Sequence, residues 1–214
     1  MKFKLLYILL FVFGTCLGQK TELDLKNYFS KTEIKDLNLI TDFFQEQICG
    51  TKDRGKFVEC ITKSLPELVD LENNYVRQKI NYRNQKKLYS KISDSTFNKI
   101  WAICKTWREV DPKYEYQSIC FSQNKLFIDF AKELGKSNKY LEYYAEKLQN
   151  IGAFDDGIFL ASNIQKAPSN WNLENRNIQI MIAIHYLTQN DMLKRDRKAA
   201  RLEKKDLRKL NRKK

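Results

Sequence analysis

The amino-acid sequence predicts an all-α protein, a compact bundle of about six to eight helices from which a basic C-terminal helix projects. The chain has 214 residues, of which 43% are hydrophobic, and this is enough to bury a sizeable core. Seven Gly and three Pro leave little material for the many turns of a β-sandwich. Hydrophobic residues recur at steps of three and four along most of the chain, and no segment alternates convincingly like a strand over more than five residues.

Residues 1–18 have the pattern of a secretory signal peptide. Two lysines precede an apolar run from Leu5 to Phe13, and small residues follow it. The run is shorter than the about 20 residues that a bilayer requires. We therefore expect an exported protein, in the bacterial periplasm or outside the cell, whose mature chain starts at Gln19. Lipid anchoring at Cys16 is the alternative, although the residues before it fit a lipoprotein cleavage site poorly. No later apolar run reaches membrane length, so the mature chain is expected to have no transmembrane span.

Four cysteines remain after removal of the signal, an even number in a compartment that permits disulfides. They form two local couples, and a segment rich in charged and turn-forming residues separates the members of each couple. We predict the disulfides Cys49–Cys60 and Cys104–Cys120, each of which is expected to join the end of one helix to the start of the next. A metal site is disfavoured because the chain has no Cys-x-x-Cys and only one histidine.

The first half of the body carries two capping boxes. Ser30 and Glu33 open a helix whose apolar stripe ends before Gly50. A second box at 64–67 predicts the start of a long helix that continues to about Tyr89.

The middle of the chain also follows a helical spacing. Ser93 is expected to cap a helix that extends to about Trp107 and is broken by Asp111-Pro112. The stripe resumes from Tyr116 to Leu134, which predicts another helix.

The last third contains three more predicted helices. The first begins at Ser137 and places Tyr140 and Tyr144 on one buried face, and a shorter one covers residues 154–164. Trp171 follows a loop and is expected to be partly exposed. Residues 178–187 are the most apolar stretch of the mature chain, so we place them at the centre of the packing.

The formal net charge of +13 is concentrated at the C-terminus. Residues 194–214 hold twelve Lys or Arg against three acids, a net charge of +9, whereas residues 19–193 carry a net charge of only +2. We therefore divide the chain into a signal peptide (1–18), a helical domain with two local disulfides (19–193) and a basic helical tail (194–214). The tail lacks Gly and Pro and has high helix propensity, so it is expected to extend the last helix of the domain.

The tail is the candidate site for an anionic partner. The basic residues assigned to it are Lys194, Arg195, Arg197, Lys198, Arg201, Lys204, Lys205, Arg208, Lys209 and Arg212. Anionic lipid and acidic polysaccharide are the partners considered, and a merely solubilising role is the alternative. Nucleic acid is disfavoured because no aromatic residues are interleaved with the charges.

No motif in the sequence compels a chemistry, and no catalytic residue, metal or cofactor is predicted. His185 is the only histidine, and its helical neighbours are largely apolar, so a partly buried ring with its hydrogen bonds satisfied is the favoured interpretation. Asp155-Asp156-Gly157 lacks the alternating ligands of a calcium loop and is expected to form a turn. The favoured function is a non-catalytic binding or structural component of the cell envelope. The alternative is a secreted hydrolase of a cell-wall or lipid substrate that uses carboxylates or His185.

Overall fold

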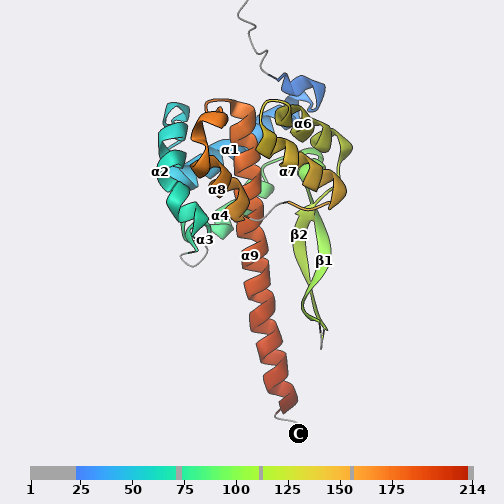
Figure 1. Cartoon of the computed structure of the whole chain (residues 1–214). Coiled ribbons are helices and arrows are strands. Elements are labelled where there is room, and N and C mark those ends of the chain that lie inside the picture. Colours follow the sequence, from blue (N-terminus) through green and yellow to red (C-terminus); the bar gives the residue numbers. More distant parts are fainter. Residues whose placement is uncertain (1–22, 71–73, 111–112, 155–156, 212–214) are drawn as a thin grey trace, which may run out of the picture.

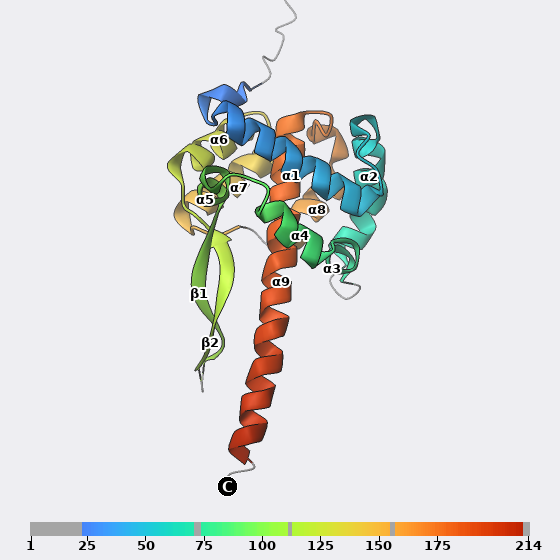
Figure 2. The same ribbon diagram turned by 180° about the vertical axis from the view of Figure 1, so that it is seen from behind.

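The computed structural model describes residues 23–70, 74–110, 113–154 and 157–211. Within them the chain folds as a helical body from which a β-hairpin and a long C-terminal helix project side by side (Figures 1 and 2). The α-helices are α1 (Lys31–Cys49), α2 (Phe57–Val69), α3 (Tyr75–Lys79), α4 (Tyr82–Tyr89), α5 (Asp94–Ile100), α6 (Lys125–Gly135), α7 (Lys139–Asn150), α8 (Gly157–Lys166) and α9 (Arg176–Asn211). Strands β1 (Trp101–Val110) and β2 (Lys113–Phe121) form the hairpin. The predicted helical bundle with a projecting C-terminal helix is confirmed.

Helix α1 begins as the sequence predicts. Ser30 accepts from the backbone N–H of Glu33, and the Glu33 side chain accepts from the Ser30 N–H, so both halves of the capping box are present. The helix ends at Gly50, which adopts a left-handed conformation that glycine reaches without steric cost.

The predicted second capping box is wrong. Helix α2 already begins at Phe57, and Pro66 lies inside it. The reason is packing: Phe57, Ile61 and Leu65 recur at four-residue steps and are buried together, which favours a helix through the whole segment. Ser64 therefore sits within the helix, with its hydroxyl 3.1 Å from the Tyr75 hydroxyl. The expected continuous helix to Tyr89 is divided into the short helices α3 and α4.

Two further predictions are wrong: the end of the helix expected to reach Trp107, and the start of the helix expected at Tyr116, are both strands. Ser93 does cap α5, but this helix stops at Ile100 and the chain continues directly into β1. The two strands pair antiparallel, with Trp101 opposite Phe121 and Thr106 opposite Tyr116. The segment is rich in aromatic and β-branched residues, which suit a half-buried strand. The spacing of its apolar residues fits both the period of a helix and that of a strand.

Both predicted disulfides are present in the structure. Cys49 at the end of α1 bonds to Cys60 in α2, with their Cα atoms 5.8 Å apart. Cys104 in β1 bonds to Cys120 in β2, with their Cα atoms 6.0 Å apart. The first bridge joins two helices, as expected. The second joins the strands of the hairpin rather than two helices.

The core surrounds the first half of α9, as predicted for residues 178–187. Ile180, Ala183 and Leu187 are fully buried, and α1 packs across this segment (Figure 2). Trp171 is a correction: it is only 4% exposed, because its indole stacks on the Tyr140 ring with centroids 6.2 Å apart. Within the described residues, no helix has an apolar stretch long enough to span a membrane.

Candidate anion-binding site on helix α9

Helix α9 is continuous from the core to the basic tail. Its first half is enclosed by the body, and its second half runs outward beside the hairpin (Figure 1). The expected extension of the last body helix is therefore present through Asn211, the last described residue. An isolated helix of this composition would be marginal in water, so its contacts with the body and the hairpin matter for its stability.

The root of the tail is held by a buried ion pair. Asp191 is fully buried and accepts from the Arg195 guanidinium one turn later. Burial raises the pKa of the Asp191 carboxyl, although Arg195 and the hydroxyls of Tyr82 and Tyr89 oppose this effect. Arg195 thus serves to neutralise a buried carboxylate and is directed into the protein.

The hairpin covers one side of the tail. Arg108 in β1 donates to Glu203 at 3.0 Å and also pairs with Asp196. The Tyr116 hydroxyl lies 3.4 Å from the same Asp196 carboxylate, and Ala199 between these two acids is only 3% exposed. The acidic side of the tail is therefore turned toward the hairpin.

The opposite side of the tail is uniformly basic. At about 100° per residue, the three acids of the tail fall on the hairpin side, and a set of Lys and Arg residues occupies an arc of about 140° centred away from it. We call this arc the basic face; its exposed members are Arg197, Lys198, Arg201, Lys204, Lys205, Arg208 and Lys209. Within the described part of the chain only Lys209 among them forms an ion pair, a 3.5 Å contact with Asp206.

An open recess lies along the basic face. It has a volume of about 560 Å³, and its lining side chains are Arg201, Lys204, Lys205, Arg208 and Lys209. Guanidinium and ammonium groups offer only hydrogen-bond donors. The chemistry available here is binding of carboxylate, sulfate or phosphate groups, with attraction that weakens as salt increases.

The ten predicted tail residues occupy different positions. Seven form the basic face. Lys194 reaches the backbone carbonyl of Arg77 at 3.5 Å, and partial burial together with neighbouring Arg77 and Arg197 lowers its pKa. Arg195 is committed to Asp191. Arg212 lies outside the described residues, as does Cys16, the residue of the alternative lipid-anchoring route.

The residues considered for catalysis or metal binding are not members of the basic face. His185 is fully buried, with its Nδ1 atom 3.0 Å from the Tyr144 hydroxyl, which agrees with a structural ring in the core. Among the described residues, no three His, Cys, Asp or Glu side chains are grouped so that they could hold a metal ion. The carboxylates of the Asp155-Asp156 turn lie outside the described residues.

Arg108 is the residue of this site that the sequence analysis missed. It lies between the expected helix end at about Trp107 and the break at Asp111-Pro112, so nothing in the sequence suggested that it faces the tail. The one-sided tail could have been recognised from the sequence, because Asp196, Glu203 and Asp206 recur at helical spacing and therefore share one side.

Comparison of the chain with protein-family models, with curated proteins and with solved structures finds no match. The candidate function therefore depends on the geometry of the chain itself.

Proposed function

We propose that this protein is an exported, non-catalytic binding component of the cell envelope, which uses the basic face of α9 to hold an extended acidic polysaccharide. The observation that carries the proposal is the separation of charge around the tail. Asp196 and Glu203 point to the hairpin and pair with Arg108, so the opposite side presents cations with almost no competing carboxylate.

The length and shape of the basic face favour a polymer. From Arg197 to Lys209 the helix advances about 18 Å, at about 1.5 Å per residue. A linear polyanion lying along the helix can place several charged groups on the face together, so weak contacts add up.

The same geometry disfavours insertion into a membrane as the main mode of binding. An interfacial helix needs an apolar face opposite its charges. Here the side opposite the basic face carries Asp196 and Glu203 and is covered by the hairpin. Purely electrostatic attraction to anionic lipid headgroups remains the competing outcome of the test below.

The proposed location follows from the N-terminal pattern and the disulfides. Residues 1–18 are proposed to be a signal peptide, and they lie outside the described residues. Two disulfides suit an oxidising compartment such as the periplasm or the exterior of the cell. The remaining chain then comprises the domain 19–193 and the tail 194–214, with their boundary inside α9.

The experiment compares two triple variants of the mature protein that lose the same charge. One carries Arg201→Gln, Lys204→Gln and Arg208→Gln on the basic face. The matched control carries Lys31→Gln, Lys35→Gln and Lys63→Gln, all exposed positions on the body. Each is tested for retention on alginate resin and on vesicles containing phosphatidylglycerol, at low and high salt.

The proposal expects salt-sensitive retention on alginate that the basic-face variant loses and the control keeps. Equal loss in both variants would mean that only net charge matters and would overturn the site. Retention on the anionic vesicles but not on alginate would replace the polysaccharide with a lipid surface. Retention that neither substitution nor salt affects would reject the role of the tail altogether.

A further inference from the structure

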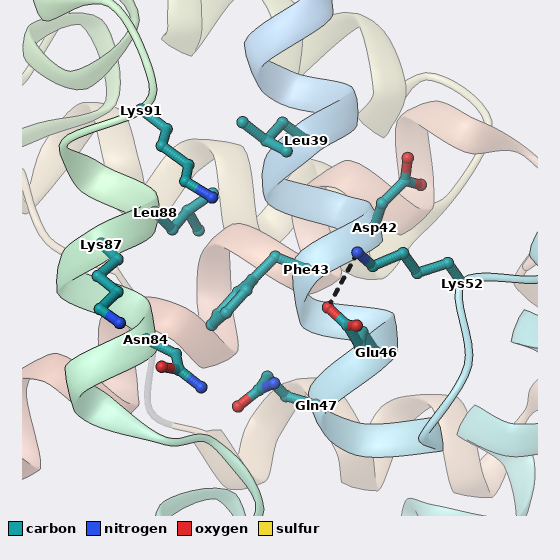
Figure 3. A pocket seen from close by; sticks show the side chains of 10 residues that line it. All are labelled: Leu39, Asp42, Phe43, Glu46, Gln47, Lys52, Asn84, Lys87, Leu88 and Lys91. Carbon is teal, nitrogen blue, oxygen red and sulfur yellow. Dashed lines mark ion pairs between the residues drawn. The ribbon is translucent and has the colours of Figure 1, made fainter.

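A second recess, separate from the one on the tail, lies in the body as a groove between α1 and α4. Its volume is about 390 Å³, within the usual range for small-molecule sites. None of its lining residues belongs to α9, so it is separate from the basic face. Figure 3 shows its walls, with side chains from α1 and the loop after it on one side, and from α4 and the turn after it on the other.

The floor of the groove is apolar. Phe43 extends from α1 toward α4, Leu88 lines the groove from α4, and Leu39 lies one turn earlier on α1 (Figure 3). Leu39 is 39% exposed. A ligand that covered Leu39 and Phe43 would remove apolar surface from water, which is favourable.

The acids at the groove are already neutralised. Glu46 pairs with Lys52 at 3.2 Å. Asp42 accepts from Arg54 at 3.0 Å and pairs with Arg176 as well. Burial alone would raise the pKa of Asp42, but the hydrogen bonds from the two arginines outweigh it and lower the pKa, so this carboxylate stays charged and occupied.

The opposite wall, formed by α4 and the turn that follows it, carries two cations. Lys87 and Lys91 extend into the groove (Figure 3), and within the described residues neither forms an ion pair with a carboxylate. Gln47 accepts from the backbone N–H of Asn81 at 2.9 Å through its oxygen, which directs its amide nitrogen away from that contact. The Asn84 amide lies beside it at the same end of the groove.

We infer that the α1–α4 groove binds a small amphipathic anion, with its carboxylate or phosphate against Lys87 and Lys91 and its apolar body on Phe43 and Leu39. The charge of the groove selects the sign of the ligand, since both of its acids are paired, whereas Lys87 and Lys91 form no ion pair within the described residues. The apolar floor selects an amphiphile over a simple anion.

The test measures binding of decanoate and of decyl phosphate to the mature protein, by titration calorimetry below their micelle concentrations. Amide chemical shifts in α1 and α4 report where the ligand sits. Acetate has the same charge without the apolar body, and decyltrimethylammonium has the apolar chain with the opposite charge.

The expected result is binding of at least one anionic amphiphile, with shifts confined to the groove, and at least tenfold weaker binding of acetate and decyltrimethylammonium. Lys87→Gln with Lys91→Gln should weaken the anionic amphiphile at least tenfold, as should Leu39→Asn. Arg83→Gln with Lys86→Gln removes the same charge from exposed positions of α4 outside the groove and should leave binding unchanged.

Three outcomes would overturn the inference. The first is no binding of either anionic amphiphile. The second is equal binding of decyltrimethylammonium, which would indicate contact with apolar surface of any kind. The third is evidence of net-charge attraction alone. This would be an equal loss of affinity in the two double variants, or chemical-shift changes located on α9. A preference for decanoate or for decyl phosphate identifies the head group.

Discussion

The indole N–H of Trp101 donates to the hydroxyl of Thr188 at 2.8 Å, and both residues are buried. Trp101 is the first residue of the hairpin, and Thr188 lies in the core segment of α9. Further out, Arg108 connects the same two elements through Asp196 and Glu203. The hairpin and the tail are therefore fixed to each other at two points, one inside the body and one outside it.

Thr188→Val should lower the free energy of unfolding by about 1–3 kcal/mol. The substitution keeps the volume of the side chain but leaves the buried indole N–H without its acceptor. Urea unfolding followed by tryptophan fluorescence measures this. An unchanged midpoint would contradict the importance of this hydrogen bond.

Arg108→Ala should loosen the tail without unfolding the body. The variant loses charge-assisted hydrogen bonds to two acids of α9, so amide exchange in residues 197–210 is expected to accelerate about tenfold, equivalent to about 1.4 kcal/mol. Arg83→Ala, on the exposed side of α4, is the control and should leave exchange in the tail unchanged. Acceleration throughout the core instead would show that Arg108 supports the whole fold.

Glu33 should make the protein sensitive to acid. Burial alone would raise its pKa, but hydrogen bonds from Lys99, Ser95 and the Ser30 backbone lower the pKa from 4.5 to about 2. Because the folded-state pKa lies below the unfolded one, the contribution is fully present above pH 4.5 and is lost as the pH falls toward 2. The shift corresponds to on the order of 3 kcal/mol.

This dependence can be measured by urea unfolding of the wild type and of Glu33→Gln between pH 6 and pH 2. The variant should be less stable at pH 6, and the difference should shrink on acidification. Glu59→Gln, an exposed acid of α2, should follow the wild-type profile. A constant difference across this range would reject the assigned pKa.

The disulfides should account for all four cysteines of the mature chain. A thiol titration of the denatured, unreduced protein is expected to find no free thiol. Replacing Cys49 and Cys60 together with Ala should lower the free energy of unfolding by about 3 kcal/mol, because the bridge restricts the unfolded chain. Four titratable thiols in the exported protein would contradict both bridges.

Local signals in the sequence predicted much of the helical architecture. Ser30, Ser93 and Gly50 mark helix boundaries through contacts with residues close by in the chain, so the sequence alone reveals them. The apolar stretch at 178–187 predicted the centre of the core for a similar reason, since only burial can satisfy so continuous a run.

The sequence did not predict the hairpin, because the apolar residues of β1 fit the period of a helix as well as that of a strand. Trp101, Cys104 and Trp107 are spaced as on a helix, and pairing with the next strand of the hairpin, β2, decides the outcome. For a similar reason, the sequence predicted only part of the candidate site. The sequence shows how many cations the tail holds, whereas the partner of its acidic side, Arg108, depends on where the hairpin packs.

Helix α9 runs without interruption from the middle of the body to Asn211, so the protein has no joint between its arm and its interior. Force applied at the far end of this helix would be transmitted directly to the hydrophobic core. A molecule attached through this helix would therefore keep a fixed orientation of its body, and the packing of the core would resist the force.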